Sequence, residues 1–421
     1  MSFASSCTVY NKFHFRILHN FFVQLSFNNL QFKTFFFAQT STNLFLMIHS
    51  SFQLPFSTVA SFNGVHLFCK TQNVGLDMTE FDENGLVIWK EFESLLFIGI
   101  STNLTEKVLR NLIEKSFLAM VLHVGINEVK NMKNVDRFKR DLRSSYFQIV
   151  EKLMEFSETD LLEYNESILC HEAEAIQEKL IEFSVQTSSP YSFILSKNRL
   201  ICATEGFYDL HVTDRKMLIL LLTQSSALQK DFPIFLPKKS PTVAYRLISL
   251  PLIQGISVGL ICGAKPSYEE LEALSQEYWQ DHYELLVSAE VGNPRNFPPS
   301  LELDPAIMGF LLVNKALKKY VISKNIQQVV GKRGSHRTDI LKAFFHQCVD
   351  NDDHNNSPSH GAGSYKVTDQ YYTSDYHKCH ATIKDEVILC VLYVSAVPTH
   401  TMRFITQDLL ARLNAEKSYP L

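Results

Sequence analysis

The first part of the sequence lacks acidic residues, because no aspartate or glutamate occurs before Asp77. Phenylalanine is frequent instead, with twelve copies among the first 52 residues. A secretory signal peptide needs a basic start and a continuous apolar run, whereas the apolar clusters between residues 35 and 48 are interrupted by Gln39 and Asn43. A membrane span needs about twenty consecutive apolar residues, and no window here supplies them. We therefore expect neither a signal peptide nor a transmembrane segment.

Closely spaced cysteines and an excess of charge are also lacking. The eight cysteines are scattered singly, with no CxxC pair, which argues against a disulfide framework and favours a reducing, cytoplasmic compartment. The formal net charge of -4 is small, and 46% hydrophobic with 20% charged residues is near the average of soluble proteins. Binding to nucleic acid, which depends on a positive surface, is therefore not expected. A chain of 421 residues is long enough for about two to four domains.

An ordered pattern of elements begins near Leu54 and defines a first domain over residues 53–157. A short helical stretch precedes alternating or apolar segments at 74–79, 85–91 and 94–101, which predict strands. Thr105 is placed to cap the helix that follows.

The last helix predicted in this domain is amphipathic. Its apolar residues recur at helical spacing from Val135 to Leu153. Three basic residues fall largely on the other face: Lys139, Arg140 and Arg143. A solvated helix surface is the simpler interpretation, and a docking surface for an acidic partner or an anionic lipid surface is the functional one.

A charged, helix-prone connector over residues 158–189 leads to a second domain over 190–290. Two strands joined by a polar turn begin this domain, followed by a helix that Asp214 is predicted to cap. Three apolar strands come next, and Ser267 opens the closing helix. The predicted order is strand, strand, helix, three strands, helix.

A Pro- and Asn-rich linker at 292–299 separates this domain from a third, over residues 300–418. A third hairpin precedes a helix that is predicted to start at Asp339, and the polar stretch 350–364 is predicted to be a loop. Two strands, near 379–384 and 387–395, precede the last helix. The sequence thus predicts three α/β units of one architecture.

Motifs for catalysis or metal binding are weak. The loop at 331–335 lacks the spacing of a phosphate-binding loop. Ser257 lies in a Gly-x-Ser-x-Gly string, but strand residues follow it where a nucleophile elbow turns into a helix. Glu205 and Gly206 end a strand, where a turn is the simpler interpretation and a catalytic carboxylate the alternative.

The part of the chain near the C-terminus contains residue types that can bind a metal ion. Metal-capable side chains gather there at a spacing that fits no zinc signature: His377, Cys379, His380 and Cys390. Residues on a strand alternate between the two faces of its sheet, so ordinary strand positions are the simpler interpretation. No catalytic, cofactor-binding or metal-binding residue is predicted.

Long stretches of the sequence resemble the Fuzzy family: LPFSTVASFNGVHLF at 54–68, AMVLHVGINEVKNMKNVDRFKRDLRSSY at 119–146, ATEGFYDL at 203–210 and DFPIFLPKKSPTVAYRLISLPLI at 231–253. The resemblance implies three longin-like (profilin-like) α/β domains in tandem. It also implies that the first domain is incomplete and lacks clear first two strands, because the family places them where this chain has its Phe-rich opening. Residues 1–52 are then an atypical segment outside the native fold, translated from a misassigned exon or intron, or an alternative N-terminal exon.

The resemblance further implies a planar cell polarity effector that acts in cilium assembly and vesicle-mediated transport. Such a protein joins Inturned and Fritz in the ciliogenesis and planar polarity effector complex, and with Inturned acts on a small Rab-like GTPase as part of a guanine nucleotide exchange factor. It implies no catalytic residue or cofactor, and a place in the cytoplasm, at the cytoskeleton and the cilium basal body. The alternative is a stand-alone α/β enzyme or small-molecule binding protein, which should show a pocket with converging titratable groups.

Overall fold

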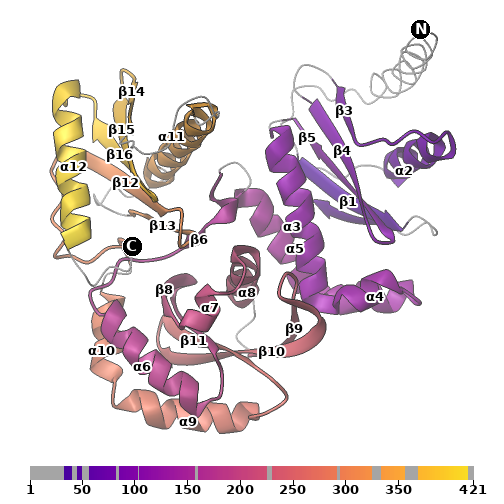
Figure 1. The fold of residues 1–421 in the computed structure, drawn as a ribbon, viewed down its shortest axis with the longest axis horizontal. Helices are drawn as coiled ribbons and strands as arrows, with labels where there is room; N and C mark the ends of the chain where they lie inside the picture. The colour runs from indigo at the N-terminus through magenta and orange to yellow at the C-terminus, as the bar shows by residue number, and fades with distance from the viewer. Residues whose placement is uncertain are drawn as a thin grey trace, which may run out of the picture. The chain divides into compact units, whose positions relative to one another are not determined.

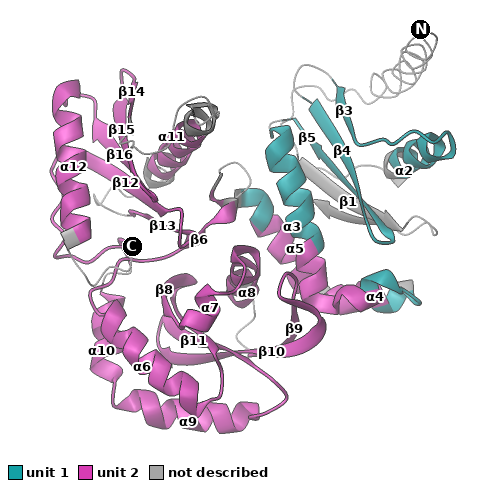
Figure 2. Cartoon of the chain, in the orientation of Figure 1, with its two compact units in different colours: residues 1–117, 129–137, 153–158 teal, residues 118–128, 138–152, 159–421 magenta. Residues whose placement is uncertain are grey.

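The computed structural model describes residues 33–39, 45–49, 56–81, 85–102, 104–156, 160–224, 230–291, 294–324, 333–355 and 368–415. The chain divides into two compact units, coloured teal and magenta in Figure 2. One unit comprises residues 1–117, 129–137 and 153–158, and the other comprises the remaining segments. The first unit holds a five-stranded sheet, and the second holds a five-stranded and a six-stranded sheet.

The first sheet has the strand order β2-β1-β5-β4-β3 (Figure 1). Its central strand β5 is buried along its whole length, as its run of apolar residues predicts. The elements of this region are β1 (Lys33–Gln39), β2 (Phe45–His49), α2 (Phe56–Thr71), β3 (Met78–Phe81), β4 (Gly85–Phe92), β5 (Leu95–Ser101), α3 (Glu106–Val124), α4 (Ile126–Lys130) and α5 (Val135–Phe156).

The expectation that the first domain lacks its first two strands is wrong. β1 runs antiparallel to β2, with Thr34 opposite His49, and antiparallel to β5, with Lys33 opposite Ser101. The prediction failed because β1 shows no alternation of polar and apolar residues, and a strand of a sheet that is covered on both faces can be apolar on both. Residues 1–32, 40–44 and 50–52 of the atypical segment lie outside the described part of the chain.

The second sheet has the order β8-β7-β11-β10-β9. Helices α6, α9 and α10 cover one face and share a buried apolar core with strands β7, β8, β10 and β11. The elements are α6 (Ala173–Gln186), β7 (Tyr191–Ser196), β8 (Arg199–Ala203), α7 (Glu205–Tyr208), α8 (Val212–Gln224), β9 (Asp231–Leu236), β10 (Ser240–Ile253), β11 (Ile256–Cys262), α9 (Tyr268–Gln280) and α10 (Tyr283–Glu290).

Two helix starts that the sequence predicts in this domain have different outcomes. Ser267 caps α9 in a full capping box with Glu270, as predicted. Asp214 does not cap α8, which begins two residues earlier at Val212. Its buried carboxylate accepts the backbone N–H groups of Lys238 and Lys239, at 3.0 and 3.1 Å, and so anchors the β9–β10 turn.

The third sheet has the order β14-β15-β16-β12-β13-β6. Helix α11 packs on one face and α12 on the other, each with its own buried cluster (Figure 1). The elements are η1 (Asp160–Glu163), β6 (Asn165–Glu166), β12 (Ile307–Asn314), β13 (Lys319–Ile322), α11 (Arg333–Asn355), β14 (Thr368–Thr373), β15 (His377–Lys384), β16 (Val387–Val394) and α12 (Thr399–Ala415).

Three details of the third domain correct the sequence interpretation. α11 begins at Arg333, so Asp339 lies within the helix and does not start it. The same helix extends to Asn355, into the stretch 350–364 that was predicted to be a loop. β14 was not predicted, because the polar residues of its sequence TDQYYT resemble those of the loop before it.

All three sheets share one topology. The second sheet reads β8-β7-β11-β10-β9 and the third, without β6, reads β13-β12-β16-β15-β14. In each, the first strand of a hairpin lies beside the last strand of a three-stranded meander, and a helix connects the hairpin to the meander. The prediction of three tandem α/β units of one architecture is confirmed.

Candidate protein-interaction site

The basic residues that the sequence predicts as a docking surface lie on α5. Asn134 caps this helix, since its Oδ1 accepts the backbone N–H of Arg137 at 3.0 Å. Phe138 is fully buried, whereas Lys139 and Arg140 are exposed. Arg143 lies on the same helix, and its side chain is outside the described part of the chain. The structure therefore brings Lys139 and Arg140 to one exposed stretch of helix.

Nearby acidic residues reduce the positive electrostatic potential around Lys139 and Arg140. Asp136 and Asp141 are both exposed on α5, next to the two basic side chains. Exposed charges interact weakly and are screened by salt over about 8–10 Å. Such a surface affects the rate of association with an acidic partner more than the final affinity.

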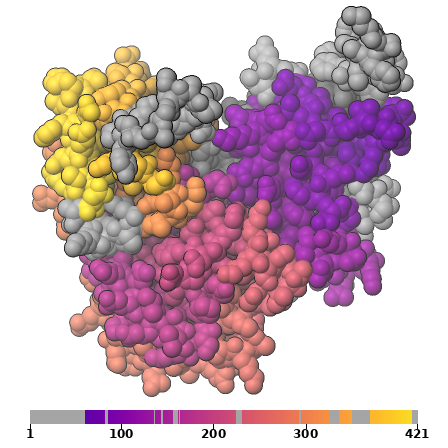
Figure 3. All heavy atoms as spheres, in the orientation of Figure 1, coloured from indigo at the N-terminus to yellow at the C-terminus, as the bar shows by residue number. Residues whose placement is uncertain are grey.

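A second candidate region is formed by backbone hydrogen bonds of the connector between the first two domains. Its extended segment pairs with the edge strands of both sheets in the second unit. The backbone N–H of Ser167 donates to the carbonyl of Tyr320 on β13 at 2.8 Å, and that of Ile168 donates to the carbonyl of Leu200 on β8 at 3.1 Å. In the space-filling view, orange atoms of the third domain lie against the pink second domain (Figure 3). The connector thus joins the two sheets edge to edge.

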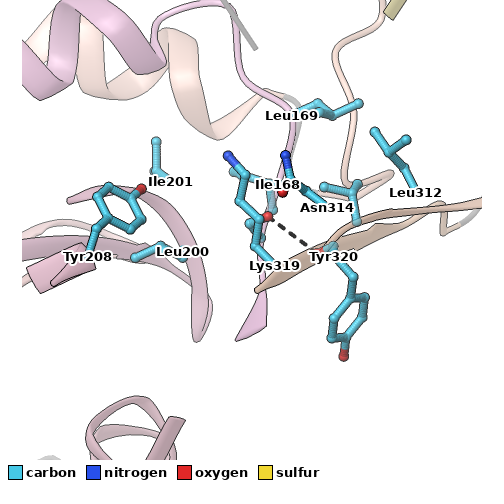
Figure 4. Close-up of a pocket in the computed structure, with 11 residues that line it drawn as sticks. Ile168, Leu169, Leu200, Ile201, Tyr208, Leu312, Asn314, Lys319 and Tyr320 are labelled. Atoms are coloured by element: carbon cyan, nitrogen blue, oxygen red, sulfur yellow. Dashed lines mark hydrogen bonds between the residues drawn. The ribbon is translucent and has the colours of Figure 1, made fainter. Parts of the chain in front are cut away.

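A cavity of about 20 Å³ lies at this joint (Figure 4). Lys319 and its register partner Asn314 line it from the third sheet, and Tyr208 lines it from the second domain. The volume is enough for about one water molecule. Lys319 is only 8% exposed, and burial lowers its pKa to about 8. No carboxylate lies within ion-pair distance of Lys319 among the residues that the structure describes.

The segment 292–299, predicted as a linker from its composition, takes part in the same joint. Asn296 is fully buried with φ of 70°, a left-handed conformation that asparagine tolerates. Its Oδ1 accepts a hydrogen bond from Arg199, and its Nδ2 donates to the carbonyl of Ile322 at 2.7 Å. Glu166 accepts from Lys324 at 2.5 Å. The prediction of a simple linker is corrected: Asn296 anchors this segment between the two domains.

A buried polar network in the third domain has the composition of a catalytic triad. The Thr406 Oγ1 lies 2.7 Å from His380 Nδ1, and His380 Nε2 lies 3.5 Å from Asp369 Oδ1, too long for a good hydrogen bond. His380 and Thr406 are fully buried, and burial lowers the pKa of His380 to about 4. Asp369 is also bound by Thr382 at 3.0 Å and by Arg403 at 2.8 Å. Since a substrate cannot reach the hydroxyl group, this network ties α12 to the sheet.

The other motifs have structural explanations. Cys379 and His380 are adjacent on β15 and so face opposite sides of the sheet, and the described residues contain no group of three metal-ligating side chains. Ser257 lies inside β11 and not at a strand-to-helix turn. Gly206 is in α7, where a Cβ atom would lie 2.5 Å from the carbonyl oxygen of Pro190. Close packing, and not an unusual backbone angle, therefore requires this glycine.

Comparisons with known proteins identify the domains. Residues 33–153 match the family described as the first longin domain of FUZ, MON1 and HPS1, residues 187–280 match the second, and residues 306–417 match the third. The chain is 30% identical to Protein fuzzy homolog of Xenopus tropicalis over 396 residues, which cover 88% of this chain and 94% of that protein.

The chain belongs to the Fuzzy family. The mouse and human proteins of the same name are 31% and 32% identical over about 70% of this chain and 72% and 71% of their own length. The match of the first longin domain begins at Lys33, so it includes β1 and β2, which were predicted to be missing. Among the helices that the structure describes, none is long and apolar enough to cross a bilayer.

Sequence reasoning missed the joint because its residues are far apart in the sequence. Ser167 and Tyr320 are 153 residues apart, and Asn296 and Glu166 are 130 apart. The sequence signal at the joint was weak: Asn314 ends the otherwise apolar strand β12 and Lys319 begins β13, where polar residues are ordinary for a hairpin turn.

Proposed function

We propose that this protein acts as a planar cell polarity effector in cilium assembly, as a subunit of the ciliogenesis and planar polarity effector complex with Inturned and Fritz. One observation carries the proposal: three longin domains follow in the same order as in the Fuzzy relatives, over residues 33–417. Longin folds contribute binding surfaces in this scheme, and no side chain of this chain performs bond chemistry. The expected location is the cytoplasm, at the cytoskeleton and the basal body, in support of vesicle transport to cilia.

We further propose that a pair of this protein with Inturned promotes nucleotide exchange on a Rab-like GTPase. Exchange requires the pair to bind the nucleotide-free conformation of the GTPase more tightly than the nucleotide-bound one. The test uses both full-length proteins, purified together, and the release of a fluorescent GDP analogue from a panel of Rab-like GTPases. Acceleration of release from one member supports the proposal. A stable complex that accelerates release from none contradicts the exchange activity, and failure to form a complex contradicts the partnership.

The basic residues of α5 are proposed to dock an acidic partner or an anionic lipid surface. Lys139 and Arg140 are exposed, so reversing their charge should leave the fold intact, with a change in the free energy of unfolding within about 0.5 kcal/mol. The triple variant Lys139→Glu/Arg140→Glu/Arg143→Glu should associate more slowly with Inturned or with anionic vesicles, most strongly at low salt.

A matched control variant carries the same change in net charge at exposed positions outside α5. Lys265, Arg295 and Lys384 are all exposed, and their triple Glu variant should bind at the wild-type rate. Surface plasmon resonance with Inturned and flotation of vesicles containing phosphatidylserine measure the two partners separately. If both triple variants bind like the wild type, the basic residues of α5 form only a solvated surface.

A further inference from the structure

The strand β14 lies at the edge of the third sheet opposite β6. Among the described strands it pairs with β15 alone, in a regular antiparallel register from Thr368–Ile383 to Thr373–Lys378. The backbone N–H of Ser374 donates to the carbonyl of His377 at 3.0 Å, which makes these two residues a hydrogen-bonded pair. Hydrogen-bonded and non-hydrogen-bonded pairs alternate along such a ladder. The backbone N–H and C=O groups of Asp369, Tyr371 and Thr373 therefore point away from β15.

Other sheet edges of the second unit are protected. The connector covers β13 and β8, as described above. The edge strand β9 has an exposed proline, Pro233, at its third position, and proline cannot donate to an added strand. β14 contains no proline, glycine or lysine over its six residues. Its one charged residue, Asp369, accepts from Thr382 and pairs with Arg403, so its charge is partly neutralised and protects the edge only weakly.

Exposed aromatic side chains surround this edge. Tyr371 and Tyr372 are 46% and 42% exposed and, as neighbours on a strand, face opposite sides of the sheet. Tyr376, in the turn that follows, is 86% exposed. Arg403 of α12 reaches Asp369 of β14, and the next residue, Phe404, is 76% exposed. An added strand would thus find apolar surface for its side chains on both faces.

The opposite edge of the same sheet already binds an extended segment of this chain. In the same sheet, the extended segment Asn165–Glu166 adds to β13 through backbone hydrogen bonds, although it is only two residues long. The third sheet is therefore completed by an extended segment at one edge and is open to one at the other. We propose that the edge of β14 is a docking site for an extended peptide segment of a partner protein, which adds to the third sheet as a further strand.

The partner segment has a defined chemistry. Successive residues of an added strand alternate between the two faces of the sheet, and those on the α12 face meet Tyr371 with the exposed Phe404 nearby, so β-branched or aromatic side chains should recur at every second position. Acidic side chains are disfavoured near Asp369, which is only partly neutralised by an exposed Arg403. The segment should therefore be uncharged or basic and free of proline.

The first test selects peptides without prior choice of a partner. The full chain is immobilised and a phage-displayed library of twelve-residue peptides is selected against it. The selected peptides should show apolar residues at every second position, and as synthetic fluorescent peptides they should bind at least 10-fold more weakly to the Thr373→Pro variant. Thr373→Val keeps the outward N–H group and should bind like the wild type. Absence of the alternating pattern, or equal binding to both variants, overturns the proposal.

Hydrogen exchange, resolved to single residues by fragmentation in the mass spectrometer, tests the site directly. In the free chain, the amides of Tyr371 and Thr373 should exchange at least 10-fold faster than those of Gln370 and Tyr372, and a selected peptide should slow them. If the outward amides are already protected, the chain itself or a second copy covers the edge. A concentration-dependent dimer that Thr373→Pro dissociates identifies the second copy. Either result overturns the proposal of a partner peptide.

Discussion

The two ends of the third sheet differ in what completes them. At one end, β13 pairs with β6, and the joint around it includes Asn296, Glu166 and the buried Lys319. At the other end, β14 pairs only with β15 among the described strands, and Asp369 and His380 are held by side chains of α12. Pairing with β6 satisfies outward backbone groups of β13, whereas no described strand pairs with the outward backbone groups of β14. One strand order thus produces both an internal joint and an open edge.

The largest expected effect is at the joined end. Ser167→Pro removes the N–H group that donates to the Tyr320 carbonyl and also the Oγ that contacts the same oxygen. An unsatisfied buried carbonyl costs about 1–3 kcal/mol, and proline is poorly tolerated inside a sheet, so we expect a loss of about 3–4 kcal/mol of unfolding free energy. Urea denaturation measures it. Ser167→Ala, which keeps the N–H group, should lose less than half as much, and equal losses would contradict the role of the backbone bond.

Lowering the pH should destabilise the protein through His380, at the β14 end of the third sheet. Burial lowers the pKa of His380 from 6.5 to about 4, and the groups that face it are Asp369, Arg403, Thr406 and Tyr371. Between these two pH values the unfolded chain binds more protons than the folded chain, so stability falls as pH falls, by about 3 kcal/mol for this group. Denaturation midpoints from pH 7 to 4.5 measure the slope. His380→Gln should flatten it and the exposed His400→Gln should not; identical slopes in all three proteins would refute the assignment.

At alkaline pH, the stability of the protein should depend on the protonation of Lys319. Burial lowers its pKa from 10.5 to about 8, so between these values the unfolded chain again binds more protons and stability rises with pH. Over pH 8 to 9.5 the rise for this group is about 2 kcal/mol. Lys319→Met, which retains an unbranched apolar side chain, should remove the rise and increase stability at pH 7. A variant with unchanged pH dependence would show that the ammonium group is solvated in the native state.

The smallest expected effect on stability comes from comparing the N–H groups of β14 that point away from β15 with those that bond to it. Thr373→Pro removes an N–H group that points away from β15, so the free energy of unfolding should change by less than about 1 kcal/mol. Tyr372→Pro removes a group that bonds to β15 and should cost more than about 2 kcal/mol. Thermal unfolding of the two variants side by side measures the difference. Equal losses would mean that the alternation inferred from Ser374 and His377 is reversed.

The sequence was sufficient for the repeated order of elements wherever periodicity was clear. The capping box at Ser267 and the strands around 85–101 and 256–262 lie where the sequence predicts them. It failed at β1 and β14, the first because a strand of a sheet covered on both faces need not alternate and the second because a polar edge strand resembles a loop. It also misplaced the start of the helix at Asp339, since acidic residues occur within helices as well as at their caps.

Of the candidate interaction site, the sequence predicted the exposure of Lys139 and Arg140, because helical spacing determines which residues share a face. Local order, apolar faces and membership of the Fuzzy family were all determined by residues close together in the chain. Only the tertiary structure decided which sheet edge is covered and which is open. That choice depends on pairings between segments more than 100 residues apart, such as Ser167 with Tyr320, and backbone groups that form such pairs are the same in every residue.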